Sequence, residues 1–129
     1  MKFAYTILYV RDVEKTLSFY ETVFGLTRKF ISPDKTYGEL DTGETTLSFA
    51  AVTLAQSNLT AGFTESSPAN KPFAMEIGFT TEDVEKAVNH AVKAGAILVE
   101  KAKTKPWGQV VAYVRDPDGF LIEICTPMS

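Results

Sequence analysis

Polar and apolar positions near the start of the chain change from a period of two to a helical period. Over residues 5–10 alternate side chains fall on opposite faces, which predicts a β-strand. Over residues 13–24 the apolar residues recur every three or four positions, which predicts an amphipathic helix. Asp12 is a typical N-cap for this helix, and Gly25 suits the left-handed conformation that ends many helices. The chain therefore opens with a strand followed by a helix.

The same order of elements recurs in the second half. The tetrapeptide Asp-Val-Glu-Lys at residues 12–15 is repeated at residues 83–86. It follows a second predicted strand, residues 73–79, and precedes a helical stretch that ends at Gly95. An internal repeat of whole elements often decides a fold. The buried stripe of this second helix is predicted to consist of Val84, Val88 and Ala91.

Three strand-like runs follow each predicted helix. In the first half they cover residues 28–31, 36–41 and 45–51, and in the second half residues 97–101, 109–115 and 120–126. The last two are joined by DPDG at residues 116–119, where proline fixes one backbone angle and glycine supplies a positive φ. Each half therefore reads as βαβββ. A ferredoxin-like βαββαβ fold would leave one strand after each helix, and three are present.

We expect one domain over residues 1–129, with a first module (1–54), a polar linker or flap (55–70) and a second module (71–129). Each module has one helix, which can cover only one face of its sheet. The expected fold class is α+β: two βαβββ modules form a cupped, barrel-like mixed sheet with the helices on its outer face. The open face of such a cup is suited to a small molecule.

Charge and composition disfavour several classes of function. The net charge of −3 and the lack of a long basic cluster disfavour binding to nucleic acid. No apolar run reaches the roughly 20 residues of a membrane-spanning helix, and the opening residues do not resemble a secretory leader. The lone Cys125 cannot form an internal disulfide, in agreement with a reducing compartment. These features predict a cytoplasmic protein.

Three segments carry a resemblance to a known family. They are the strand-Arg-Asp-Val-helix opening, residues 19–26 (FYETVFGL) and, most specifically, residues 116–123 (DPDGFLIE). Together they resemble the vicinal oxygen chelate superfamily, which includes glyoxalase I, bleomycin-resistance proteins, extradiol dioxygenases and fosfomycin-resistance proteins. The resemblance covers nearly the whole chain. It implies a homodimer, with the cup completed near the subunit boundary.

The resemblance also implies four positions for metal ligands, on the first and last strand of each module. Here they carry Tyr5, Ser48, Glu76 and Glu123, and strand alternation points all four into the expected cup. Glyoxalase-type ions such as Ni²⁺ or Zn²⁺ prefer imidazole nitrogens together with carboxylates. The positions expected to hold histidine carry Tyr5 and Glu76 instead. We therefore expect no cofactor and no tightly held metal; a divalent ion, if one binds, is expected to be held weakly by Glu76 and Glu123.

Glu76 and Glu123 are also the candidate catalytic residues. Two carboxyl groups close together in a partly dry site raise the pKa of one of them, which would give an acid/base pair. The pair can equally complement a cationic ligand, or one carboxylate can simply be hydrogen-bonded to Tyr5 or neutralised by a lysine. The sequence alone leaves these uses open, and with them the question of whether any reaction is catalysed.

Aromatic and polar residues are predicted to form the rest of the ligand site. The residues assigned to it beyond the four positions are Tyr9, Tyr37, Trp107 and Gln109. Aromatic walls with polar tips hold planar or cationic organic ligands. Tyr113 is expected in the core, His90 on the surface and Cys125 as a small buried hydrophobe. Phe63, in the linker, is only a candidate lid.

The leading functional hypothesis is a small-molecule-binding protein that resembles bleomycin-resistance-type members and lacks a catalytic metal. One alternative is a glyoxalase-like lyase or isomerase that uses a divalent metal or the Glu76/Glu123 pair. The other is a non-catalytic dimeric interaction module. The expected partners are a small molecule and a second copy of the chain, with no nucleic acid and no membrane.

Overall fold

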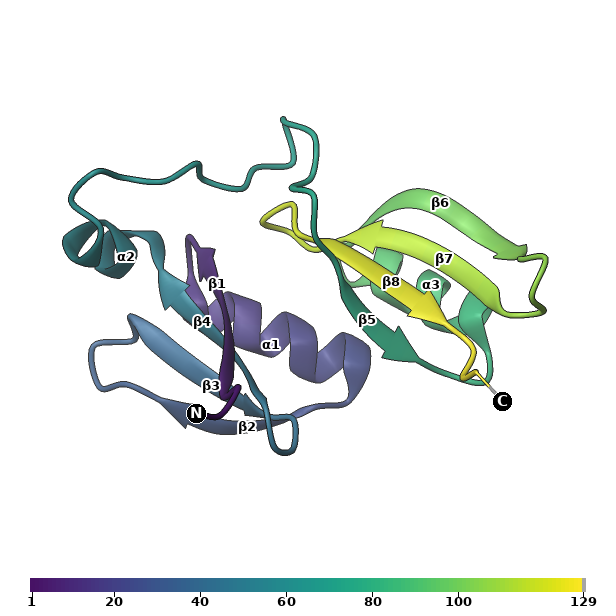
Figure 1. The fold of residues 1–129 in the computed structure, drawn as a ribbon, viewed down its shortest axis with the longest axis horizontal. Coiled ribbons are helices and arrows are strands. Elements are labelled where there is room, and N and C mark those ends of the chain that lie inside the picture. The colour runs from purple at the N-terminus through teal and green to yellow at the C-terminus, as the bar shows by residue number, and fades with distance from the viewer. Residues whose placement is uncertain (129) are drawn as a thin grey trace. The chain divides into compact units, whose positions relative to one another are not determined.

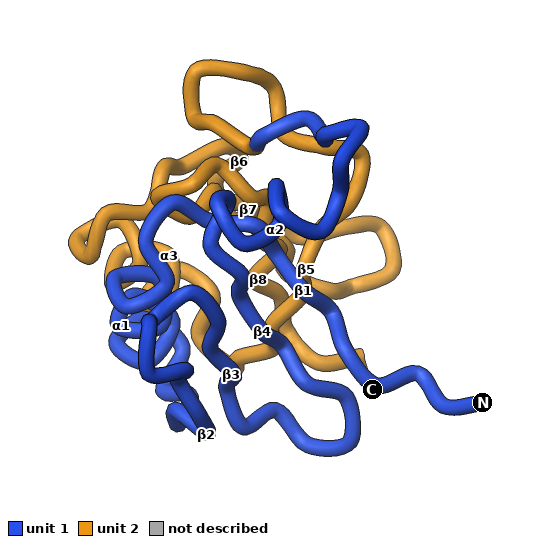
Figure 2. The backbone as a smooth tube through the Cα atoms, turned by 90° about the vertical axis from the view of Figure 1, so that its left-hand side faces the viewer, with its two compact units in different colours: residues 1–65 blue, residues 66–129 orange. Residues whose placement is uncertain are grey.

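A computed structural model describes residues 1–128, with Ser129 outside the description. The chain divides into two compact units, the first covering residues 1–65 and the second beginning at Ser66. The boundary falls inside the segment that was expected to link two modules. Figure 1 shows the elements along the chain, and Figure 2 colours the two units separately. The elements of the first unit are β1 (Tyr5–Val10), α1 (Val13–Phe24), β2 (Thr27–Ile31), β3 (Tyr37–Asp41), β4 (Thr46–Ala51) and α2 (Val52–Asn58). Those of the second unit are β5 (Ile77–Thr80), α3 (Val84–Lys93), β6 (Ile97–Thr104), β7 (Val110–Arg115) and β8 (Leu121–Cys125).

The two units share one sheet topology. The strand order is β1-β4-β3-β2 in the first sheet and β5-β8-β7-β6 in the second. In each sheet the first strand pairs in parallel with the last strand, and the remaining pairs are antiparallel. The βαβββ repeat and the mixed α+β class predicted from the sequence are therefore confirmed. Each sheet keeps two edge strands, so neither closes into a barrel.

Helix α1 forms as its sequence predicts. The Asp12 carboxylate accepts a hydrogen bond from the Lys15 amide at 3.1 Å, and Gly25 ends the helix with φ at 66°. The buried face of α1 packs on one side of the first sheet, where Leu17 and Tyr20 are fully buried. On this side Gly38 of β3 leaves room for Leu17, because a Cβ atom at Gly38 would lie 2.6 Å from Leu17 Cδ1. The core of the first unit therefore lies between α1 and its sheet.

Helix α3 covers one side of the second sheet in the same way. Asp83 caps the helix by accepting from the Lys86 amide, and Val84, Val88 and Ala91 are buried as predicted. These three residues face the side of β8 that carries the buried Ile122 and Ile124. His90 is exposed, as expected.

The segment that joins the units differs from the expected polar linker. Its first part is the short helix α2, which contacts β1 and β4 and buries Ala55. This helix has no side-chain N-cap, so the usual start signal was missing from the sequence.

The strand predicted at residues 73–79 is also shorter than expected. β5 begins only at Ile77, so Glu76 lies just before the strand. Pairing with β8 starts at Ile77, opposite Ile122. The apolar character of residues 73–75 had suggested a longer strand, but these residues have no strand partner.

Arg115 holds residues 66–70 against the turn that joins β7 to β8. Its Nε donates to the Gly119 carbonyl at 2.8 Å, and its two Nη atoms donate to the carbonyls of Ser67 (3.0 Å), Pro68 (3.4 Å) and Asn70 (2.7 Å). The Ser66 hydroxyl donates to the Asp118 carbonyl at 2.9 Å. The turn and this segment therefore form one hydrogen-bonded cluster within the second unit.

Strand β6 is an edge strand with an irregular ladder. Its pairing with β7 shifts register between Leu98 and Glu100 and again between Glu100 and Lys103. The aliphatic side chains of Ile97, Leu98 and Val99 are each more than two-fifths exposed.

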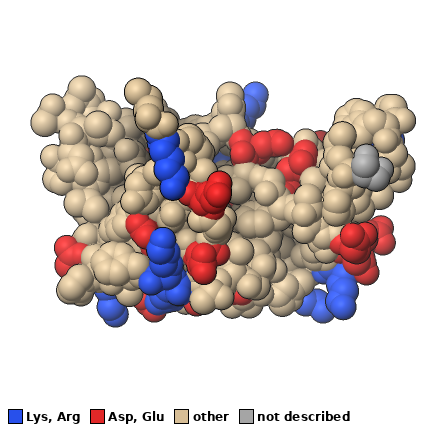
Figure 3. All heavy atoms as spheres, turned by 60° about the horizontal axis from the view of Figure 1, so that its bottom comes forward, with Lys and Arg blue, Asp and Glu red and all other residues tan. Residues whose placement is uncertain are grey.

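Across residues 1–128, no helix has the length and apolar character needed to cross a membrane. On the face drawn in Figure 3, acidic and basic side chains lie interspersed among uncharged ones.

Candidate functional site

Each sheet has one face that its own long helix does not cover, here called the open face. Residues paired across neighbouring strands project from the same face of a sheet. On the first sheet Ile7 pairs with Ser48, Ser48 with Glu39, and Glu39 with Phe30. These four residues, called the Glu39 row, lie opposite the helix-facing Gly38 and Leu40.

Tyr37 binds the carboxylate at the centre of the Glu39 row. Its hydroxyl donates to Glu39 Oε2 at 2.7 Å. Burial, the Glu39 carboxylate and the nearby Tyr5 raise the pKa of Tyr37 to about 12, against an opposing hydrogen bond from Ser48. Ser48 is fully buried, and its hydroxyl also lies 3.5 Å from the Thr6 carbonyl. The structure thus brings Tyr5, Tyr37 and Ser48 together and adds Glu39.

The open face of the second sheet carries a matching row. Gly78 pairs with Glu123, Glu123 with Tyr113, and Tyr113 with Glu100. The Tyr113 hydroxyl donates to Glu123 Oε1 at 3.0 Å. Tyr113 is half-buried, so its predicted core position is wrong: its ring shares the face of Glu123 because the two residues are register partners. These four residues are called the Glu123 row.

Glu76 interacts with the Glu123 row from the segment before β5. Burial of its carboxyl group raises the pKa of Glu76, and the negative charge and hydrogen bond of Glu123 raise it further. Glu76 is an exposed residue, so solvent screens much of this coupling. The same surroundings raise the pKa of Tyr113 to about 12, through burial first and then through Glu123. The second unit therefore offers two coupled carboxyl groups and a protonated phenol.

Cys125 lies beside the Glu123 row but is not set up as a nucleophile. The residue is buried, and burial followed by Glu123 raises the pKa of its thiol. A reactive cysteine needs the opposite shift. Its behaviour as a small buried residue agrees with the prediction.

Each row carries one carboxylate and one hydroxyl at these two central positions, but the two units place them on opposite strands. By register, Ser48 corresponds to Glu123 and Glu39 corresponds to Tyr113. In the first unit the carboxylate is on the middle strand and the hydroxyl on the last strand, whereas the second unit has the reverse. Sequence reasoning missed Glu39, although its shared parity with Tyr37 along β3 was enough to place both on one face.

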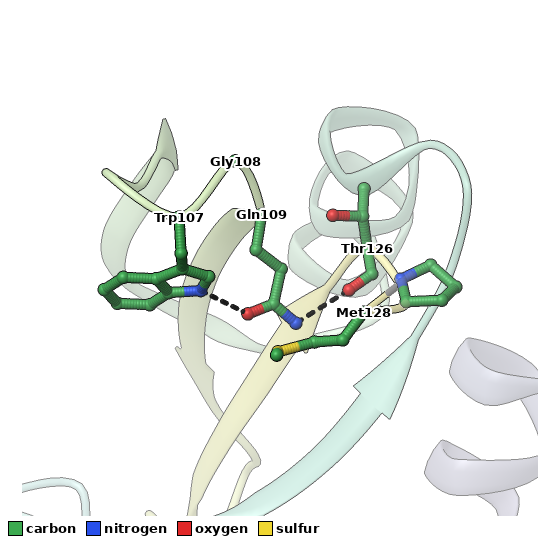
Figure 4. A pocket seen from close by; sticks show the side chains of 6 residues that line it. Trp107, Gly108, Gln109, Thr126 and Met128 are labelled. Carbon is green, nitrogen blue, oxygen red and sulfur yellow. Dashed lines mark hydrogen bonds between the residues drawn. The ribbon is translucent and has the colours of Figure 1, made fainter.

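Trp107 and Gln109 lie together, but away from the centre of the Glu123 row. Trp107 Nε1 donates to Gln109 Oε1 at 2.9 Å, and Gln109 Nε2 donates to the Thr126 carbonyl at 2.8 Å (Figure 4). Trp107 is 63% exposed. With Gly108, Thr126, Pro127 and Met128 these residues line a cavity of about 180 Å³. The cavity lies at the ends of β7 and β8, and its polar groups are largely occupied by one another.

Tyr9 and Phe63 form a contact at another end of the first open face. Tyr9 belongs to the row that pairs with Ala50 and Tyr37. The Phe63 ring lies edge-on to the Tyr9 ring, with 4.9 Å between centroids. A role for Phe63 as a lid stays a prediction.

The residues at the four family ligand positions do not fit a glyoxalase-type metal. The first unit supplies a phenol, Tyr5, and a buried hydroxyl, Ser48; the second supplies the carboxylates Glu76 and Glu123. None of these is an imidazole, and Glu123 already accepts a hydrogen bond from Tyr113. In residues 1–128 no group of three or more His, Cys, Asp or Glu side chains could hold a metal ion. The four positions therefore do not offer a donor set that suits a glyoxalase-type ion.

Known proteins resemble this chain over most of its length. Lactoylglutathione lyase GLX1 of Arabidopsis thaliana is 32% identical over 128 residues, which cover 95% of this chain and 43% of that protein. The chain thus spans less than half of that relative. The uncharacterized protein YraH of Bacillus subtilis is 30% identical over 126 residues, 96% of this chain and 97% of YraH.

Solved structures share the fold. A glyoxalase/bleomycin resistance protein/dioxygenase family enzyme from Burkholderia phytofirmans superposes with a TM-score of 0.84 at 26% identity, over 99% of this chain and 100% of that one. A glyoxalase-related enzyme from Fulvimarina pelagi gives a TM-score of 0.83 at 24% identity, over 98% of this chain and 88% of that one. The family profile described as Glyoxalase/Bleomycin resistance protein/Dioxygenase superfamily matches residues 2–124. With its two βαβββ units, the chain belongs to the glyoxalase/bleomycin resistance protein/dioxygenase superfamily.

Proposed function

We propose that the protein binds a small aromatic or cationic molecule on the open face of its second unit, and that it needs no transition metal to do so. The observation that carries this proposal is the Glu123 carboxylate on this open face, which accepts a hydrogen bond from the Tyr113 hydroxyl at 3.0 Å and has the Glu76 carboxyl group beside it. The raised pKa of Glu76 means that a second negative charge is unfavourable there. A ligand with a positive charge relieves this repulsion, which a neutral ligand does not.

The chemistry of the Glu123 row favours a cation that donates hydrogen bonds. Carboxylate oxygens accept paired hydrogen bonds from planar N–H groups, and such charge-assisted bonds are among the strongest in proteins. Gly78 has no side chain, and a Cβ atom there would come no closer than 3.8 Å to Glu123. A flat amidinium or guanidinium group attached to an aromatic ring fits this surface. A bleomycin-resistance type of role would be to bind such a compound without altering it.

Titration with benzamidine tests this proposal. Replacing Glu123 with glutamine should weaken binding about tenfold or more, because it removes the charge from a hydrogen-bonded ion pair worth about 1.5–3 kcal/mol. Glu85→Gln is the matched control, because it makes the same charge change on the exposed first turn of α3. Isothermal titration calorimetry gives the dissociation constants.

The pH dependence and the metal dependence of benzamidine affinity provide two further tests of the proposal. Below its raised pKa Glu76 is protonated, so affinity for the cation should increase as the pH rises through that value. A chelator should leave binding unchanged. Equal affinity of the Glu123→Gln and wild-type proteins, or loss of binding on chelation, would contradict the proposal.

A second candidate is a glyoxalase-like lyase or isomerase, favoured by the identity of 32% to a lactoylglutathione lyase. One carboxylate of the Glu76/Glu123 pair would remove the proton from the carbon that carries the hydroxyl group, and the acid so formed would return it to the former carbonyl carbon. The hydroxyl proton would pass to the former carbonyl oxygen, which leaves the thioester carbonyl behind. Such an enzyme should isomerise a thiohemiacetal to a thioester. The absorbance of the thioester product measures the reaction. Turnover should fall about 100-fold or more in Glu123→Gln. Unchanged turnover in this variant would exclude the pair as the base.

A further inference from the structure

Residues 59–65, called the strap here, lie between two anchored segments of the chain. Before the strap, helix α2 contacts β1 and β4 and buries Ala55. After it, Ser66 is buried, and its hydroxyl donates to the Asp118 carbonyl at 2.9 Å. From the end of α2 to the start of β5 the chain forms no helix or strand (Figure 1). The strap is therefore a short span of irregular chain that is held at both of its ends.

The strap itself makes few interactions. The Leu59 amide donates to the Ala55 carbonyl at 2.9 Å, and the Gly62 amide donates to the Leu59 carbonyl at 2.9 Å. Within residues 1–128, none of the hydrogen bonds of the strap reaches a strand. Every residue of the strap except Phe63 is exposed. A segment of this kind can open while the rest of its unit stays folded.

Phe63 attaches the strap to the first sheet. Its ring lies edge-on to the Tyr9 ring, with 4.9 Å between the centroids and 64° between the planes. Tyr9 projects from the open face, on the same side of β1 as Tyr5 and Ile7. One aromatic pair changes an equilibrium constant by about two- to twelvefold. The contact therefore favours the closed strap, and an open strap stays populated.

We propose that the strap is an autoinhibitory device, in which Phe63 occupies the place beside Tyr9 that an aromatic ligand would take. Proteins hold aromatic ligands by the same edge-on and offset contacts that pair their own rings. Phe63 is tethered, so it competes with the ligand at a fixed effective concentration. The apparent affinity for the ligand is reduced in proportion to the fraction of molecules whose strap is open. This inference concerns the first unit and does not rest on the function proposed for the second unit.

Indole distinguishes this role of Phe63 from that of a fixed wall that adds contacts to a ligand. The shifts of the amides of residues 9 and 50 in ¹⁵N–¹H correlation spectra of the full chain give its dissociation constant. Phe63→Ala should bind indole about fivefold more tightly than the wild type, because the competing ring is gone. A wall would give the opposite result.

Leu59→Ala is the matched control for the indole titration. It removes another apolar side chain from the strap, and this side chain is 41% exposed. Its affinity for indole should equal that of the wild type. Equal or weaker binding of indole by Phe63→Ala, or no shift at residues 9 and 50 in either protein, would overturn the proposal.

Cleavage by chymotrypsin after Phe63 measures opening of the strap without any ligand, because the protease must take the ring away from Tyr9. When opening is fast relative to cleavage, the rate is proportional to the open population. Tyr9→Ala should therefore speed cleavage of the 63–64 bond about fivefold, as measured by mass spectrometry. Tyr5→Ala is the control, since Tyr5 lies on the same side of the same strand and is 52% exposed.

Gly62→Ala tests the opening without changing either ring. Gly62 has φ at 81°, which disfavours a side chain, and no atom lies within 4 Å of an added Cβ. Opening relieves this strain, so cleavage of the 63–64 bond should be about fivefold faster, relative to the same bond in a peptide of residues 59–67 with the same substitution. Gly43→Ala, with φ at 89° and equally free surroundings in the turn before β4, should leave the rate unchanged.

The cleavage rates decide the proposal independently of the benzamidine titration, because they are measured without ligand. Equal rates in Tyr9→Ala and Tyr5→Ala would show that the ring contact does not hold the strap. Equal rates in Gly62→Ala and Gly43→Ala would show that the strap does not open at this position. Either result would contradict an autoinhibitory strap, whether or not the second unit binds benzamidine.

Discussion

Replacing Arg115 with methionine should lower the free energy of unfolding of the second unit by roughly 3–5 kcal/mol. Arg115 is only 7% exposed, and it donates to four backbone carbonyls. Methionine has a similar length but no donor, so these carbonyls lose their charged partner while the segment at residues 66–70 loses its attachment. Urea unfolding followed by the fluorescence of the single tryptophan, Trp107, reports on this unit.

Arg28→Met is the comparison for this variant. Arg28 also makes several polar contacts, but these are ion pairs with Glu14 and Glu21 on a partly exposed surface. Removing them should cost about 1 kcal/mol or less, measured by circular dichroism. Similar losses in the two variants would show that the Arg115 contacts to residues 66–70 contribute little to stability.

Gly119→Ala should destabilise the protein by roughly 3 kcal/mol or more, for two reasons that add. The backbone at Gly119 has φ at 95°, which an L-residue with a side chain rarely adopts. In addition, a Cβ atom would lie 2.7 Å from the Ser67 carbonyl carbon, 2.8 Å from Arg115 Nη2 and 2.9 Å from the Pro68 nitrogen. Two of these three atoms are backbone and cannot move aside cheaply.

Gly108→Ala separates the two causes. Its φ is 96°, nearly the same as at Gly119, but no atom lies within 4 Å of the position of an added Cβ. This variant should therefore lose only the backbone term, about 1–2 kcal/mol. The difference between the two midpoints of urea unfolding measures the steric contact with residues 67 and 68. Equal losses would mean that this segment moves away without cost.

The repeated elements could be predicted because their signals are local. The caps at Asp12 and Asp83 and the glycine after α1 depend on neighbours within a few residues. Alternation then placed Leu8, Ile122 and Ile124 against the helices. These features can be predicted without knowing which strands pair with each other.

The missed features depend on pairing between distant segments. Glu39 became part of a site only once β3 was known to lie between β2 and β4, with Phe30 and Ser48 on either side. Tyr113 was assigned to the core because its partner Glu123 lies ten residues away across a hairpin. Helix α2 lacks a cap, and it is held instead by its contacts with β1 and β4. Tertiary contacts, which a single sequence does not reveal, decided all three.

The two register shifts in β6 have a consequence for how molecules of this protein meet. A free sheet edge with several exposed aliphatic side chains is a template on which an unrelated strand can add itself, the first step toward insoluble assemblies. At each shift, the outward-facing backbone N–H and C=O groups of β6 no longer line up with those of the neighbouring stretch of the strand. Lys101 and Lys103 place positive charges along the same edge. An incoming strand could form backbone hydrogen bonds with only short stretches of β6. This edge of the sheet therefore resists the addition of further strands.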